Sequence, residues 1–231
     1  MRRLYRLESM MTYQHKWSSG EAISLAAGKI VCIGRNYAEH TRELNNPVPS
    51  EPMLFMKPAT SLVDITNPIL VDWTRGLVHH ELEIAVLIGE ELVHSSKEQA
   101  FSAIMGVGIA IDLTLRNLQN ELKQKGHPWE KAKAFDGSCP LSAFEPVGSF
   151  DGFENIELQL TVNGAVRQKG SSRQMLTDIV SLIEYISGWF TLKPGDVVLT
   201  GTPAGVGPLN PGDELGIDLI GHISIQTMVQ R

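Results

Sequence analysis

The stretch VHHELEIAVLIG, residues 78–89, alternates its side chains with the period of two that is typical of a β-strand. One face of this predicted strand carries Val78, His80, Leu82, Ile84, Val86 and Ile88. The other face carries His79, Glu81, Glu83, Ala85 and Leu87. Because the second face ends in apolar residues, we expect both faces to be covered. The pattern therefore places two like charges, Glu81 and Glu83, one pleat apart on a covered face.

Comparable patterns predict the remaining elements. Apolar runs predict further strands at residues 29–34, 53–58 and 106–112. Alternation around Asn163-Gly164 predicts a hairpin over 156–168. Helical spacing predicts helices at 37–44, 95–105, 113–126 and 172–188. The C-terminal part reads as short strands separated by turns. A β-rich chain with a few helices is predicted to be an α+β fold.

Composition and charge narrow the class of protein. The 231 residues are 42% hydrophobic and 20% charged, which is ordinary for a soluble globular protein. We expect a flexible N-terminal extension at 1–18 and a single domain at 19–231. A net charge of -6 argues against a nucleic-acid partner, and no apolar run is long enough to span a membrane. Cys32 and Cys139 predict buried free thiols in a reducing compartment, hence a cytoplasmic location.

The paired carboxylates suggest a metal site. Glu81 and Glu83 would lie about 6.6 Å apart along a strand, where burial makes each raise the pKa of the other. A divalent cation between them would remove this conflict; the alternative is an edge strand with a solvated face. Asp112 ends an apolar strand and could be a third oxygen ligand, the N-cap of the next helix, or both. Three carboxylates without Cys or clustered His favour Mg²⁺, Mn²⁺ or Ca²⁺ over Zn²⁺.

Other polar residues offer acid–base chemistry and anion binding. His40 and Glu43 are three residues apart, so on a helix they share a face and form either a general base or a solvated pair. Lys131 or Lys133 could neutralise carboxylate charge and bind an anionic substrate. The Gly-rich segment around Thr202 lacks the Lys-Ser/Thr of a phosphate loop. It either contacts a substrate carboxylate or forms a tight turn.

Taken together, these segments resemble the fumarylacetoacetate hydrolase family, in its short, single-domain FAHD-type and YcgM-like branch. The matching segments, in the family's order, are IGRNYAEHTREL, EPMLFMKP, VHHELEIAVLIG, GIAIDLTLRNLQ, PWEKAKAFDGSCP, LTDIVSLIEYIS and LKPGDVVLTGTPAGVGP. They span roughly residues 29–215. The resemblance implies a mixed β-sheet roll or barrel of the C-terminal-domain type of that family, with flanking helices, as a homodimer.

The resemblance also implies roles for individual residues. Glu81, Glu83 and Asp112 would bind Mg²⁺ or Mn²⁺, with Ca²⁺ as an alternative in crystals. His40 and Glu43 would form a catalytic dyad, and Lys133 would stand in the site. The expected contacts to the substrate are Arg35, Lys57, Arg116, Gln119 and Thr202.

The substrate class implied is a small 2-oxo acid with an enolisable C3. We expect hydrolysis of the C–C bond of acylpyruvates through a metal-stabilised enolate. Tautomerisation or decarboxylation of oxaloacetate needs the same enolate, so sequence motifs do not separate these reactions. A non-catalytic oxo-acid-binding protein and a structural calcium site are alternatives from other classes. Retention of His40 and Glu43 argues against the first of these.

Overall fold

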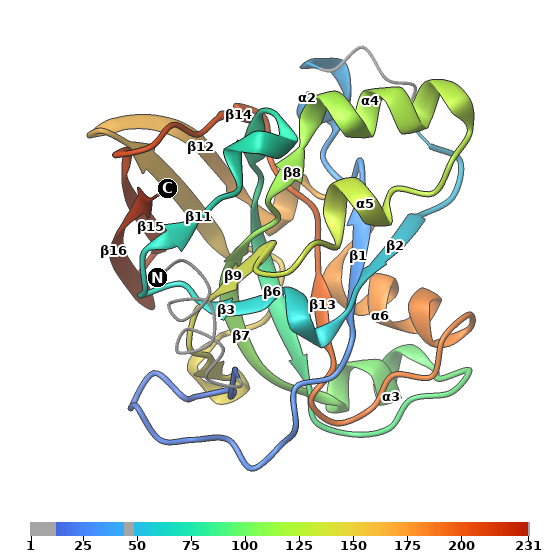
Figure 1. Cartoon of the computed structure of the whole chain (residues 1–231). Helices are drawn as coiled ribbons and strands as arrows, with labels where there is room; N and C mark the ends of the chain where they lie inside the picture. Colours follow the sequence, from blue (N-terminus) through green and yellow to red (C-terminus); the bar gives the residue numbers. More distant parts are fainter. Residues whose placement is uncertain (1–12, 44–48, 231) are drawn as a thin grey trace.

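The computed structural model describes residues 13–43 and 49–230, and their strands pair in three sheets (Figure 1). The largest sheet has eight strands in the order β2-β1-β13-β6-β7-β9-β3, with β10 paired to β7. The bounds of its strands are β1 Ile30–Gly34, β2 Met53–Lys57, β3 Leu62–Asp64, β6 Leu82–Ile88, β7 Ile104–Ile111, β9 Cys139–Leu141, β10 Glu145–Pro146 and β13 Val197–Leu199.

Two smaller sheets complete the strand framework. A five-stranded sheet has the order β12-β11-β15-β16-β4, with bounds β4 Ile69–Leu70, β11 Glu157–Val162, β12 Ala165–Ser171, β15 Glu214–Leu219 and β16 Ile223–Gln230. A three-stranded sheet has the order β14-β5-β8, with bounds β5 Val78–His80, β8 Thr114–Leu115 and β14 Gly207–Pro208.

The helices lie at two ends of the main sheet. Their bounds are α2 Ala38–Glu43, α3 Lys97–Ser102, α4 Arg116–Lys125, α5 Glu130–Lys133 and α6 Ile179–Ser187, with 3₁₀ turns η1 Ala59–Ser61, η2 Trp73–Arg75, η3 Val147–Ser149 and η4 Ser172–Gln174. In Figure 1, α3 and α6 pack together at one end, and α4 and α5 lie at the opposite end. The predicted α+β class is confirmed.

The central strands of the main sheet are buried on both faces, as the apolar pattern predicts. Along β6, alternate residues Leu82, Ile84, Val86 and Ile88 enter one hydrophobic cluster, and Ala85 and Leu87 enter a second cluster on the opposite face. Every residue of β6 is buried. Cys32 and Cys139 are buried free thiols in the second cluster, which confirms the prediction for both.

The predicted strand 78–89 is interrupted at Glu81. Before this residue, β5 pairs with β8 and β14 in the small sheet; after it, β6 pairs with β7 and β13 in the main sheet. The amide of Leu82 donates to the Gln168 side-chain oxygen at 3.0 Å, and the Glu81 carbonyl accepts from Asp112 N at 2.8 Å. Because a side chain replaces the strand partner here, the chain changes sheets without an unpaired amide.

Two helix predictions were wrong at their N-terminal ends. The predicted helix 172–188 is helical only at α6, because Asp178 starts it by accepting from Ser181 N at 2.9 Å. The residues before Asp178 form η4 and an isolated bridge between Met175 and Tyr37. Asp112 does not cap a helix, because β8 intervenes and α4 begins at Arg116.

Other local signals were correct. Asn163 and Gly164 both have positive φ, 52° and 77°, as the tight turn between β11 and β12 requires. Gly126 ends α4 in the left-handed conformation. Ser96 caps α3 with a capping box, although this helix is shorter than the predicted 95–105 because β7 begins at Ile104.

The predicted N-terminal extension at 1–18 falls mostly outside the described residues. Its described part, 13–18, packs against the domain. His15 is fully buried, and its Nε2 is 2.9 Å from the carbonyl oxygen of Gly195. Trp17 forms a bridge with Phe144. Among the described residues, no helix is long and apolar enough to cross a membrane.

Candidate active site

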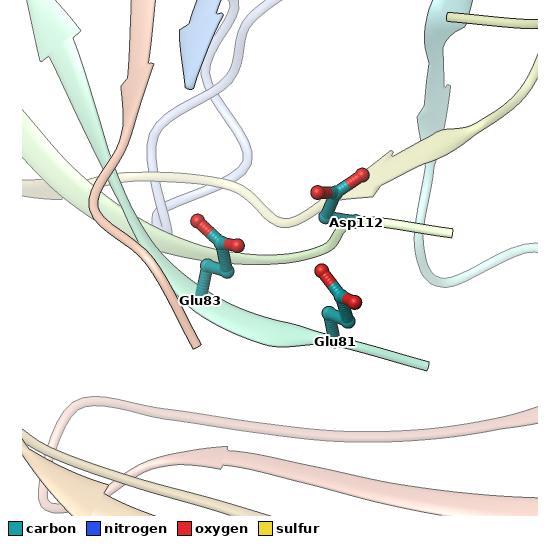
Figure 2. Close-up of side chains that lie close together, drawn as sticks. All are labelled: Glu81, Glu83 and Asp112. Carbon is teal, nitrogen blue, oxygen red and sulfur yellow. The ribbon is translucent and has the colours of Figure 1, made fainter. Parts of the chain in front are cut away.

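Three acidic side chains converge where the main sheet meets the small sheet. Glu81 occupies the break between β5 and β6, Glu83 lies on β6, and Asp112 directly follows β7. The antiparallel register of β6 and β7 brings the end of one strand beside the other, so all three carboxylates have oxygens within 4.8 Å of one another. Figure 2 shows the side chains directed toward a common space. All three are buried.

Three basic side chains balance this acidic cluster. The ammonium of Lys133 donates to Glu81 Oε2 at 2.6 Å and to Asp112 Oδ2 at 2.5 Å. Lys57, also buried, lies with its Nζ 2.8 Å from Asp112 Oδ1. Arg116 Nη2 donates to Glu81 Oε1. Three carboxylates and three cations give a formal charge of zero, and the direct pairs formed by Glu81 and Asp112 make the burial of these ionised groups tolerable.

Glu83 contacts none of these cations directly and instead accepts a hydrogen bond from Gly201 N at 2.7 Å. Burial raises the pKa of Glu83 well above its ordinary value, and the negative charges of Asp112 and Glu81 raise it further. The positive charge of Lys133 and the Gly201 amide oppose that rise only in part. A bound cation would therefore stabilise the charged form of Glu83 more than that of Glu81 or Asp112.

Lys133 is held in its protonated form. Burial alone would lower the pKa of this lysine, but the charges of Asp112 and Glu81 and the hydrogen bonds to them raise it above the ordinary value. Its backbone position follows from α5, a single turn that begins after Trp129. Lys133 therefore presents a fixed positive charge to the carboxylate cluster.

The donor set fits a hard divalent cation. The cluster offers carboxylate oxygens from three residues and neither sulfur nor imidazole nitrogen. Oxygen-only sets of this kind suit Mg²⁺, Mn²⁺ or Ca²⁺. Among the described residues no second group of three His, Cys, Asp or Glu side chains meets the same distance condition. Any ion bound here would replace Lys133 or Arg116 on some of the same oxygens.

Most of the residues predicted to be functional line one narrow cavity beside the cluster. Those lining it are Arg35, Glu81, Glu83, Arg116, Gln119, Lys133 and Thr202. The remaining space is about 30 Å³, which is room for about two water molecules. Displacement of the long, flexible side chains of Arg116 and Lys133 would enlarge this space for a substrate.

The other predicted residues are not among the described residues that line this cavity. Lys57 is behind Asp112 and also donates to Ser138 Oγ at 3.0 Å. Glu43 accepts from Gly205 N at 3.1 Å and does not line the cavity. His40 belongs to α2, but its side chain lies outside the described residues. Contact between the predicted dyad and the cluster therefore stays a prediction.

Gln168 is a residue that the sequence analysis missed. Its buried amide accepts from Leu82 N and donates to Thr202 Oγ1 at 2.7 Å and to Pro203 O at 2.9 Å. This amide ties the break in the β5–β6 strand to the loop that carries Thr202. The same loop contains Gly201, whose amide donates a hydrogen bond to Glu83. No signal in the sequence marked Gln168, which reads as one polar position in the strand β12.

Lys123 was also missed, together with the cavity-lining residues Met53, Phe55 and Trp129. A signal for Lys123 was available, because it follows Arg116 by seven residues and Gln119 by four. Residues at these spacings share one face of a helix. Phe55 and Trp129 give the cavity an aromatic wall, with their ring centres 6.0 Å apart.

A cavity lined by buried, paired charges in an α+β sheet fold is typical of an enzyme that acts on a small polar substrate. Residues 29–230 match the family model described as "Fumarylacetoacetate (FAA) hydrolase C-terminal". The chain therefore belongs to the fumarylacetoacetate hydrolase family and is an enzyme of that family. The predicted fold type and the predicted family branch are both confirmed.

Individual relatives extend over nearly the whole chain. The chain is 51% identical over 218 residues to "Oxaloacetate tautomerase YcgM" of Escherichia coli strain K12, covering 94% of this chain and 99% of the relative. It is 44% identical over 203 residues to the mitochondrial "Oxaloacetate tautomerase FAHD1" of Bos taurus, covering 87% and 91%. The crystal structure of fumarylpyruvate hydrolase from Pseudomonas aeruginosa in complex with Mn²⁺ and pyruvate superposes with a TM-score of 0.88 at 30% identity, covering 95% and 96%.

Proposed function

We propose that this protein is an oxaloacetate tautomerase, which interconverts the keto and enol forms of oxaloacetate. The supporting observation is the 51% identity, over almost the full length of both chains, to the E. coli protein of that name. The bovine relative carries the same activity in its name at 44% identity. The proposal therefore ranks acylpyruvate hydrolysis, the reaction favoured by the sequence analysis, second.

Charge balance supports a substrate with two carboxylates. The cluster of Glu81, Glu83 and Asp112 is neutralised by three basic side chains. A divalent cation alone would add two positive charges to this buried region. A dianion such as oxaloacetate would enter with the cation as a neutral pair, which limits the cost of burying both.

The side chains supply the steps of a keto–enol exchange. The reaction removes a proton from C3 of the substrate and places one on the 2-oxygen, without breaking a carbon–carbon bond. When bound to the acidic cluster, Mg²⁺ or Mn²⁺ would supply a Lewis acid that stabilises negative charge on the 2-oxygen. Lys133, held protonated, would add a second positive charge and a proton donor at that oxygen.

Arg116 and Gln119 would hold the C1 carboxylate. Arg116 Nη1 donates to Gln119 Oε1 at 2.7 Å, which fixes the orientation of that amide. The amide NH₂ of Gln119 has no acceptor among the described residues and lines the cavity as a donor. A guanidinium and an amide side by side suit a planar carboxylate. His40 stays our candidate for proton transfer at C3.

Hydrolysis of acylpyruvates is the second candidate. The neighbour from P. aeruginosa is named a fumarylpyruvate hydrolase, and its complex contains Mn²⁺ and pyruvate. Hydrolysis needs a positioned water and a base for it, the role predicted for the His40–Glu43 dyad. In this structure Glu43 accepts a hydrogen bond from the amide of Gly205 and is not among the residues that line the cavity. Tautomerisation requires no such water, although it also needs a base at C3.

The test compares three reactions on one preparation. Decay of enol absorbance follows ketonisation of enol-oxaloacetate, pyruvate release follows cleavage of acetylpyruvate, and CO₂ release follows decarboxylation. Each is measured with Mg²⁺, with Mn²⁺ and with EDTA. We expect metal-dependent ketonisation to exceed the other rates by at least tenfold. Ketonisation at the uncatalysed rate beside rapid cleavage of acetylpyruvate would reverse the assignment. The homodimer and the cytoplasmic location stay predictions.

A further inference from the structure

Helix α4 presents a row of polar side chains to the cavity. Arg116, Gln119 and Lys123 follow one another at spacings of three and four residues, so they share a face of the helix. All three line the cavity. Arg116 and Gln119 are buried, whereas Lys123 is half-buried. The row therefore runs from the acidic cluster, where Arg116 binds Glu81, toward the cavity mouth.

Lys123 differs from the other lysines at this site in its partners. Lys57 and Lys133 each pair with a carboxylate of the cluster. Among the residues that the structure describes, no carboxylate pairs with Lys123. Its ammonium lies over the ring of Trp129, 5.0 Å from the ring centre. The aromatic ring holds the side chain at the cavity wall but does not neutralise its charge.

The surroundings of Lys123 favour an incoming anion. Burial, and to a smaller extent the positive charges of Arg116 and Arg35, lower the pKa of Lys123 to about 8. A partly desolvated ammonium that faces other cations is destabilised until an anion arrives. A carboxylate bound here would be stabilised by this ammonium and by the nearby guanidinium of Arg35.

We propose that Lys123 is a specificity residue that binds the distal carboxylate of a four-carbon 2-oxo dicarboxylate. The inference rests on the proposed function, and it identifies the Lys123 ammonium as the group that selects the substrate of this enzyme. With the C1 carboxylate and the 2-oxygen held near Arg116 and Lys133, the C4 carboxylate extends toward the mouth. Lys123 lies one helical turn beyond Gln119, about 6 Å along the axis. A substrate with an uncharged end would leave Lys123 without a partner.

The experiment uses a substrate pair that differs only in the distal charge. Enol-oxaloacetate is compared with the enol of its 4-ethyl ester, for the wild-type enzyme and for Lys123→Met, Lys123→Arg and Lys125→Met. Methionine keeps an unbranched stem against Trp129 but carries no charge. Lys125 is the matched control, because it is exposed on the same helix and pairs with Glu121. Thermal unfolding of each variant verifies that it folds.

We expect Lys123→Met to lower kcat/KM for oxaloacetate roughly 10- to 100-fold, mainly through KM, as loss of a charged hydrogen bond does. The preference for oxaloacetate over its ester should fall by the same factor. Lys123→Arg should retain most of that preference, and Lys125→Met all of it. A folded Lys123→Met enzyme with the wild-type preference would overturn the inference. So would a wild-type enzyme that does not prefer the dianion.

Failure of the proposed function would look different. In that case the wild-type enzyme would not ketonise enol-oxaloacetate at all. Competition calorimetry in the presence of Mg²⁺ would then compare binding of oxaloacetate and of its 4-ethyl ester to the same proteins. A preference for the dianion that Lys123→Met abolishes would support the role of Lys123 even without turnover, and an unchanged preference would refute it.

Discussion

Replacing Lys133 by methionine should destabilise the protein in a way that a divalent cation reverses. The substitution removes the ammonium that contacts Glu81 at 2.6 Å and Asp112 at 2.5 Å, at a side chain only 3% exposed. Removing one partner of a buried ion pair costs about 3–5 kcal/mol. Because Lys57 and Arg116 still neutralise one carboxylate each, we expect the lower end, about 3 kcal/mol.

The assay is thermal and urea-induced unfolding of the wild-type protein and Lys133→Met, in EDTA and in excess Mg²⁺. For a chain of this size, 3 kcal/mol corresponds to a fall in Tm of about 6–12 °C. An ion at one hundred times its Kd adds about 2.7 kcal/mol. Mg²⁺ should stabilise the variant more than the wild-type protein, where it competes with the ammonium for the same oxygens.

The control for this prediction is Lys131→Met, which changes an exposed lysine on the same helical turn. Its free energy of unfolding should stay within about 0.5 kcal/mol of the wild-type value. The reasoning is refuted if Lys133→Met unfolds at the wild-type temperature in EDTA. It is equally refuted if Mg²⁺ leaves the gap between the two proteins unchanged.

Three further predictions follow from the same contacts. Glu83→Gln should abolish stabilisation by Mg²⁺ without lowering the free energy of unfolding in EDTA. Burial and the acidic neighbours of Glu83 already disfavour its charged form, so a neutral amide costs little there. Persistent stabilisation of the variant by Mg²⁺ would contradict this. The KM for oxaloacetate should rise above pH 8 as Lys123 loses its proton, and stay level to pH 10 in Lys123→Arg; identical KM–pH profiles would exclude the effect. Gln168→Leu should lower the free energy of unfolding, measured in urea, by about 2–4 kcal/mol, because Leu82 N loses its acceptor. It should also lower kcat, because Thr202 loses its hydrogen bond to the amide. Wild-type turnover by the variant would contradict a positioning role for Gln168.

The apolar pattern predicted the buried strands well but not where the chain changes sheets. Alternation runs through Glu81 without interruption, so nothing local marks the end of β5. The break depends on Gln168, which lies 86 residues from Leu82 in the sequence. Periodicity also extended the helix at 172–188 too far toward its start. There the cap at Asp178 was the better signal, since Met175 pairs with Tyr37 instead.

The acidic cluster could be anticipated because Glu81 and Glu83 conflict with the apolar strand that carries them. Its balance of charge could be anticipated only for one lysine, because Lys131 or Lys133 was predicted to neutralise carboxylate charge and Lys133 does so. The direct pairs of Lys57 and Arg116 could not be anticipated, because these residues reach the cluster from two other elements. Single lysines in a sequence are mostly exposed, so a buried ammonium has no local signature. Lys123 is an intermediate case: its spacing from Arg116 was visible, but the cavity it faces was not.

The small sheet β14-β5-β8 adjoins three of the segments that build the site. Strand β5 leads directly into Glu81, β8 connects Asp112 to Arg116, and β14 follows the loop of Thr202. Its ladders are only two residues long, so it is the most easily opened of the three sheets. Amide exchange there should report ligand occupancy earlier than exchange in the long strands. Opening these two short ladders would therefore weaken substrate binding, proton transfer and ion affinity together.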